Sequence, residues 1–103
     1  MATGAGYFEF IKEQLSSLNG VSYTRMMGEY IIRCNDRVVG GIYDDRLLVK
    51  PTASAKRMMP DAHTELPYDG AKEMLAVDNV DDREFLCRLI EAVAEELPPR
   101  KPR

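Results

Sequence analysis

The chain has 103 residues, of which 45% are hydrophobic and 30% charged, and it carries a formal net charge of −3 at pH 7. This length suits one domain that buries its own core, and the composition excludes an intrinsically disordered body. The negative net charge argues against a strong general affinity for nucleic acids.

The first predicted element is a helix over residues 7–18. Its apolar residues recur at spacings of three and four, which places most of them on one helical stripe. Gly20 follows and can adopt the left-handed conformation that ends many helices. The apolar positions are Tyr7, Phe8, Phe10, Ile11, Leu15 and Leu18.

Four short strands are predicted next, at residues 21–26, 30–34, 38–43 and 47–50. They are rich in β-branched and aromatic residues, and polar pairs separate the later ones, which is typical of antiparallel hairpins. The pairs Asn35-Asp36 and Asp44-Asp45 contain no glycine, so the sequence leaves the turn type open. Gly40-Gly41, inside the third strand, indicates a bulge or a close approach, which we expect from the first or last helix.

The C-terminal half begins with a short helix. Pro51 closes the fourth strand, and Thr52 is the expected N-cap of a helix over 53–59. A loop over 61–72, a strand over 73–77 and a helix that ends at Leu97 complete the pattern. Asp81 is the predicted N-cap of that last helix, with Glu84 as its capping-box partner. We expect residues 98–103 to form a basic, flexible tail.

This order of elements predicts an α+β fold in one domain over residues 1–97. We expect an antiparallel sheet of about five strands, with the N-terminal helix, the short middle helix and the C-terminal helix packed mainly on one face. The other face of such a sheet can remain open to solvent and to a partner.

Two cysteines, Cys34 and Cys87, are too few for a disulfide scaffold, so free thiols in a reducing compartment are expected. The N-terminus lacks the basic start and apolar run of a signal peptide, and no segment approaches the roughly 20 apolar residues of a membrane helix. The sequence therefore predicts a cytoplasmic protein with no membrane association.

Charge is distributed unevenly along the chain. Residues 21–57 hold seven basic and four acidic residues, whereas residues 58–97 hold three basic and eleven acidic ones. In alternating positions Arg33, Arg46 and Lys50 share one face of the sheet, with Leu48 between the last two. This face is either a solvated basic surface or a partner surface that uses arginine.

The most distinctive local stretch is residues 26–30, Met-Met-Gly-Glu-Tyr. It is either a turn flanked by core methionines or an adaptable recognition patch, because methionine repacks easily against different partners. The candidate partner-binding residues are Arg25, Met26, Met27, Gly28, Glu29, Tyr30, Arg33, Arg46, Leu48 and Lys50.

A catalytic or metal centre is not indicated. His63 is the single histidine and lies in a predicted loop, and zinc would need three or four ligands. A small enzyme or ligand carrier would require Cys34, His63 and nearby carboxylates to converge in space. We expect no catalytic residue, no metal and no cofactor.

Four stretches together resemble the N-terminal domain of the TfoX/Sxy family, bacterial regulators of competence-specific genes. They are YTRMMGEY (23–30), DDRLLVKP (44–51), PYDGAK (67–72) and DDREFL (81–86). The resemblance implies a cytoplasmic bacterial protein, an α+β fold and a non-enzymatic accessory role in transcription alongside the cyclic-AMP receptor protein. Competence regulators carry a second, helical domain, which has no counterpart here, so a stand-alone form is expected.

The expected function is therefore regulation by protein–protein contact, with the cyclic-AMP receptor protein or RNA polymerase as partner. One alternative is weak direct DNA binding through the arginines of the sheet and the basic tail, which would depend steeply on salt. Another is a free-standing domain with an unrelated binding function. A homodimer built on a twofold contact is also expected.

Overall fold

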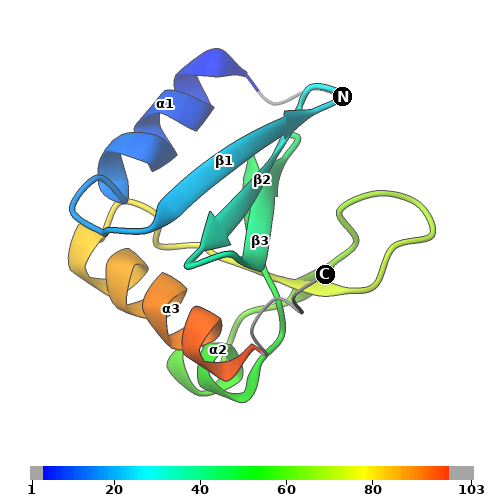
Figure 1. Ribbon diagram of the computed structural model, residues 1–103. Helices are drawn as coiled ribbons and strands as arrows, with labels where there is room; N and C mark the ends of the chain where they lie inside the picture. The colour runs from blue at the N-terminus through cyan, green and yellow to red at the C-terminus, as the bar shows by residue number, and fades with distance from the viewer. Residues whose placement is uncertain (1–3, 98–103) are drawn as a thin grey trace, which may run out of the picture.

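The computed structural model describes residues 4–97, in which three helices and six strands form one sheet-and-helix unit (Figure 1). The predicted basic tail over 98–103 lies outside the described residues. In chain order the elements are α1 (Ala5–Gln14), β1 (Val21–Met26), β2 (Glu29–Cys34), β3 (Arg37–Tyr43), β4 (Arg46–Val49), α2 (Ala53–Met58), β5 (Thr64–Glu65), β6 (Met74–Ala76) and α3 (Arg83–Glu96).

The six strands form one antiparallel sheet in the order β1-β2-β3-β4-β6-β5. This confirms the predicted α+β class. The expected number of about five strands was one too low, because β5 lies in the segment predicted as loop. Only Thr64 and Glu65 pair with β6 there, and two residues are too few to show an alternating pattern.

Three consecutive hairpins join β1 to β4 through two-residue turns. Both central residues of each turn have positive φ, which identifies type I′ turns, whose twist matches that of the flanking strands. The φ values are 55° and 85° at Met27 and Gly28, 53° and 67° at Asn35 and Asp36, and 51° and 57° at Asp44 and Asp45.

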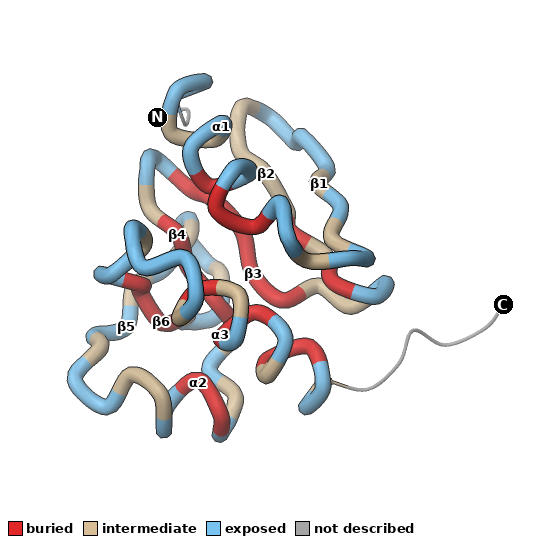
Figure 2. Tube along the Cα trace, turned by 90° about the vertical axis from the view of Figure 1, so that its left-hand side faces the viewer, coloured by how far each residue is buried: buried red, intermediate tan, exposed pale blue. Residues whose placement is uncertain are grey.

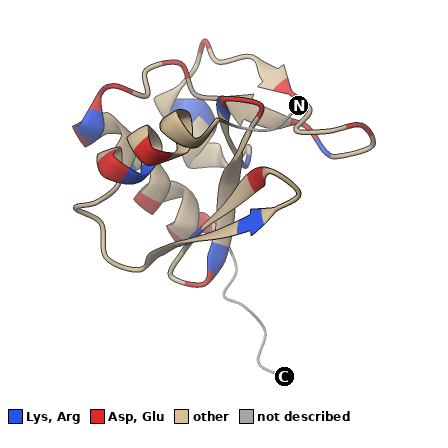
Figure 3. Cartoon of the chain, turned by 90° about the horizontal axis from the view of Figure 1, so that it is seen from above, with Lys and Arg blue, Asp and Glu red and all other residues tan. Residues whose placement is uncertain are grey.

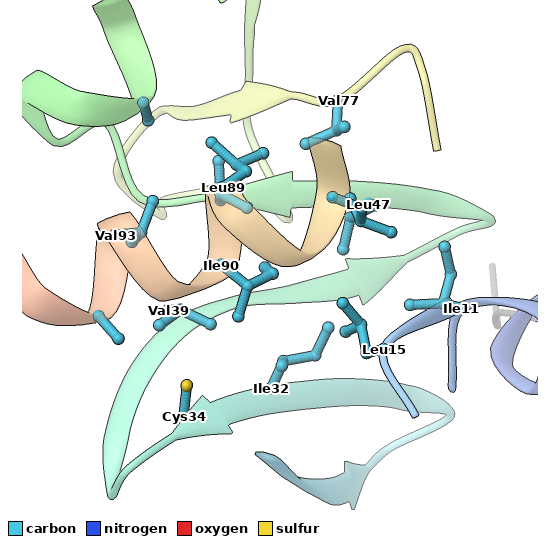
Figure 4. Close-up of a cluster of buried hydrophobic side chains, with 14 of the residues drawn as sticks. Ile11, Leu15, Ile32, Cys34, Val39, Leu47, Val77, Leu89, Ile90 and Val93 are labelled. Carbon is cyan, nitrogen blue, oxygen red and sulfur yellow. The ribbon is translucent and has the colours of Figure 1, made fainter. Parts of the chain in front are cut away.

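The main core lies between the helices and one face of the sheet. Leu89, Ile90 and Val93 of α3 point toward the strands (Figure 4), and Ile11 of α1 and Leu15, the C-cap of that helix, complete the same cluster. Each of these side chains is at most 1% exposed, and burying one stabilises the fold by roughly 1.5–3 kcal/mol. The prediction that the helices pack on one face is confirmed.

The helix ends are held by specific hydrogen bonds. Thr52 caps α2 as predicted, since its hydroxyl accepts from the N–H of Ala55 at 3.2 Å. For α3 the predicted cap Asp81 was wrong by one residue: Asp82 caps it, accepting from the N–H of Phe85 at 3.1 Å. The carboxylate of Glu96 accepts from the N–H of Ser54 at 2.8 Å and ties the end of α3 to the start of α2.

The glycine pair in β3 has two different causes, and neither is a helix. A Cβ on Gly40 would lie 2.1 Å from the backbone oxygen of Leu48 in β4, next to a register shift in the β2–β3 pairing. A Cβ on Gly41 would lie 2.6 Å from the backbone oxygen of Tyr30 in β2 and 2.7 Å from the ring of Tyr43. The expectation of a close approach is confirmed, but the neighbouring strands β4 and β2 and the ring of Tyr43 make that approach.

Candidate protein-binding surface

The face of the sheet opposite the helices, termed the second face below, carries a small apolar cluster of its own. Its buried members are Tyr43, Leu48 and Ala76, and Ile31 and Met74 pack against them. Leu48 is 0% exposed, so the expectation that it lies on an open partner surface is wrong. The ring of Tyr43 covers Gly41, the cross-strand neighbour of Leu48, and helps to seal this site.

The β5–β6 loop (66–73) extends from this side of the sheet (Figure 1). The ring of Tyr68 lies 6.4 Å from that of Tyr43, measured between centroids, so the loop borders two hollows. The first, termed the lysine groove, has a volume of about 520 Å³, and its lining includes Val38, Tyr43, Lys50, Tyr68, Lys72 and Met74. The second, termed the hairpin hollow, has about 560 Å³ and is lined by Met27, Glu29, Asp44, Arg46, Pro67, Tyr68 and Asp69.

The basic residues predicted for one face do share the second face, but two of them are already engaged. Arg46 donates to the backbone oxygen of Tyr43 at 3.0 Å and forms an ion pair with Glu65. Arg33 donates to the hydroxyl of Thr24. Among residues 4–97, Lys50 has no carboxylate partner. Figure 3 shows basic and acidic residues interspersed rather than separated by face.

Glu65 is held between two basic groups. Besides Arg46, the Nε2 atom of His63 lies 2.6 Å from a carboxylate oxygen of Glu65. The hydrogen bond from Arg46, followed by that with His63, lowers the pKa of the Glu65 carboxyl. Glu65 therefore remains ionised to lower pH than a free glutamate and fixes Arg46 at the rim of the hairpin hollow.

The Met26–Tyr30 segment divides between the two faces. Tyr30 stacks on Phe8 of α1, with ring centroids 3.8 Å apart, and is thus a helix-side residue. Arg25 pairs with Tyr30 and shares its side of the sheet. Glu29 accepts from the N–H of Asp44 at 2.7 Å, which joins the two neighbouring hairpin turns.

The most exposed large hydrophobic side chain in the described part of the chain is Met27, which is 96% exposed. Met26 is 53% and Tyr68 is 62% exposed, and Met27 and Tyr68 line the same hollow. The predicted turn at Gly28 is confirmed, but Met27 is itself one of its two central residues, and the prediction that the methionines belong to the core is wrong. The candidate patch thus combines methionine with an aromatic ring, both favoured at interfaces.

Sequence reasoning missed the contribution of the β5–β6 loop. Tyr68, Asp69 and Lys72 were assigned to a loop, with no indication that it borders the sheet. An exposed tyrosine between Pro67 and Gly70 was the available signal. Its position depends on the pairing of β5 with β6, which the sequence did not reveal.

The residues needed for a cysteine–histidine centre are far apart. Cys34 ends β2 and is buried, which raises the pKa of its thiol, whereas His63 directly precedes β5. Four strand spacings of about 4.8 Å separate β2 from β5, or roughly 19 Å. Within residues 4–97, no group of three or more histidine, cysteine, aspartate or glutamate side chains is placed to hold a metal ion. No helix in this part of the chain is long and apolar enough to cross a membrane.

The chain is 35% identical over 104 residues to an uncharacterized 12.7 kDa protein in the trpE 5′ region of Spirochaeta aurantia, and the alignment covers 100% of this chain and 90% of the relative. No protein-family profile matches the chain, and no solved structure matches it.

Proposed function

We propose that this chain, which belongs to the same family as the Spirochaeta aurantia protein, is a non-enzymatic accessory regulator of transcription that acts by protein–protein contact at the hairpin hollow. The resemblance of four stretches to the TfoX/Sxy N-terminal domain supports the regulatory role and a cytoplasmic, bacterial setting. It also suggests the cyclic-AMP receptor protein and RNA polymerase as the first partners to test.

The observation that carries this proposal is the conformation of Met27. Its φ of 55° lies in the left-handed region, where a residue with an unbranched apolar side chain is strained and asparagine or aspartate is favoured. The other two type I′ turns have those favoured residues, Asn35-Asp36 and Asp44-Asp45. A strained, fully exposed methionine is costly in a free protein, and contact with a partner explains its presence.

The hairpin hollow also indicates the chemistry of the partner. Three carboxylates, those of Glu29, Asp44 and Asp69, line it together with Arg46, and Arg46 is already paired with Glu65. The hollow therefore favours a surface whose apolar residue is ringed by lysine or arginine. Met27 and Tyr68 would contact the apolar residue, and the carboxylates would select the basic rim.

The test is a titration of the wild-type chain and Met27→Asn against purified cyclic-AMP receptor protein and RNA polymerase. Asparagine suits the left-handed position, so this variant should be more stable by about 0.5–1 kcal/mol in urea denaturation. The same change removes a central apolar contact and should weaken binding about tenfold. A gain in stability together with a loss of affinity separates a binding role from a structural one.

Phe10→Gln is the matched control, because Phe10 is an exposed apolar residue of α1, 40% exposed and outside the hollow. It should leave the affinity unchanged. If neither protein binds the folded wild-type chain, the named partners are wrong. If one binds and Met27→Asn binds equally well, the hairpin hollow is not the contact surface.

A further inference from the structure

The two edges of the sheet differ in how much backbone they expose. At one edge β5 pairs through only two residues. At the other, β1 is six residues long, pairs in regular register with β2 alone and contains no proline (Figure 2). Arg25 is its single charged residue. A regular edge strand with few guarding residues is a template for another strand.

The hydrogen bonds of the β1–β2 hairpin show which backbone groups face outward. The N–H of Asn35 donates to the oxygen of Gly20 at 2.9 Å, so these residues form a closely spaced pair. Such pairs recur at every second residue of an antiparallel ladder. The even-numbered residues of 20–26 therefore direct their backbone N–H and C=O groups toward β2. The residues that direct N–H and C=O groups away from the sheet, where residues 4–97 provide no partner strand, are Val21, Tyr23 and Arg25.

From this geometry we infer that two copies of the chain pair through their β1 strands, antiparallel and related by a twofold axis at Tyr23. Tyr23 then faces Tyr23 of the second copy, and Val21 faces Arg25 in both directions. Each of these closely spaced pairs exchanges two backbone hydrogen bonds. All outward donors and acceptors of β1 are satisfied, and the two sheets become one.

This register is preferred over its neighbours for two reasons. A shift by two residues leaves one outward-facing residue of each copy unpaired, and a shift by four in one direction sets Arg25 against Arg25, which is unfavourable. In the centred register Arg25 faces an aliphatic side chain instead. On the other side of the strand Ser22 faces Thr24, a cross-strand pair of hydroxyl side chains that is favourable in sheets.

The symmetry has a consequence for the second face. A twofold axis through an antiparallel strand pair stands perpendicular to the sheet, so the helices of both copies lie on one side and both second faces lie on the other. The two hairpin hollows then share one surface, which suits a partner that is itself twofold symmetric. The dimer rests on β1 alone and does not depend on the proposed function.

The test compares Arg25→Pro with Arg25→Ala by analytical ultracentrifugation. Proline removes an N–H that points outward and is not needed by the hairpin, and edge strands tolerate it. Alanine removes the same side chain but retains the donor. Because both copies carry the substitution, proline removes two hydrogen bonds from the dimer and should raise its dissociation constant about thirtyfold. Alanine should leave the dimer in place.

A second measurement uses the wild-type chain and does not depend on how the proline variant folds. Amide hydrogen exchange at Val21, Tyr23 and Arg25 should slow as protein concentration rises over a roughly hundredfold range. The amides of Thr24 and Met26 should be protected throughout, because they bond to β2. A chain that sediments as a monomer at every concentration, with exchange at Val21, Tyr23 and Arg25 independent of concentration, would overturn the inference.

Discussion

The two faces of the sheet are closed in different ways. The helix-covered face is filled by large aliphatic side chains, such as Val39, Leu47 and Ile90. The second face buries Leu48 just as fully, but it does so with the ring of Tyr43 laid across Gly41. The rim of the second face keeps charged groups and exposed methionines. The stability of the fold therefore resides mainly on the helix side, and the second face contributes less to it.

The largest expected effect tests the helix side. Leu89→Ala removes a 0% exposed side chain of α3 from the main core and leaves a cavity that the surrounding strands cannot fill. The free energy of unfolding should fall by about 3–4 kcal/mol, measured by urea denaturation. This is a large fraction of the stability of a chain of this size.

Ile31→Ala is the matched variant on the second face, where Ile31 is only partly buried. The free energy of unfolding should fall by only about 1 kcal/mol, because a partly buried side chain has less apolar area shielded from water to lose. Equal losses for the two variants would mean that the faces share the stability and that the contrast drawn between them is wrong.

Gly40→Ala should have the next largest effect, because it alters the strand that both faces share. The new Cβ would lie 2.1 Å from the backbone oxygen of Leu48, and backbone cannot move aside as a side chain can. We expect a loss of about 2 kcal/mol or more in the free energy of unfolding. Gly6→Ala in α1 is the control: apart from its chain neighbours and the backbone of the helix, no atom of residues 4–97 lies within 4 Å of its Cβ position, and alanine should stabilise that helix by up to about 1 kcal/mol. A tolerated alanine at residue 40 would contradict the close approach of β4.

Local chemistry explains what the sequence could predict. The hairpins of β1 to β4 followed from β-branched residues separated by polar pairs, and Thr52 was recognisable as a cap because a hydroxyl before a helix has one obvious role. Asp81 and Asp82 are equally able to cap, and only the path of the chain into α3 selects Asp82. The turn type was open because Asn35-Asp36 contains no glycine, although both residues tolerate positive φ.

The parts that could not be predicted depend on contacts between distant residues. Leu48 alternates with Arg46 and Lys50, so the pattern alone predicts that it faces solvent. It is buried because Tyr43 and Gly41 of β3 and Ala76 of β6 lie beside it. The candidate site likewise combines Met27 with Tyr68, far apart in sequence. Pattern placed the methionines at a turn, but it could not show that the β5–β6 loop borders the same hollow.

The smallest expected effect concerns the electrostatics of the second face. Arg46 and His63 lower the pKa of Glu65 in the fold, so the folded chain holds this carboxylate more strongly than the unfolded chain does. The resulting stability is present in full above the ordinary glutamate pKa near 4.3. It is lost as pH falls through the lowered pKa of the folded state. As Glu65 is a surface group, the contribution should stay below about 1 kcal/mol.

Glu65→Gln tests this contribution through urea denaturation at several pH values. Wild type should be the more stable chain near neutral pH, and the difference should shrink steadily once the solution is more acidic than the ordinary glutamate pKa. Glu9→Gln is the control for the removal of a charge alone, because Glu9 is an exposed residue of α1, away from Arg46 and His63. The helix side should respond little to acid, because its main core is aliphatic. A Glu65→Gln difference that stays constant into strong acid would show that the pairing with Arg46 and His63 adds nothing to the fold, and the rim of the hairpin hollow would then be held by packing alone.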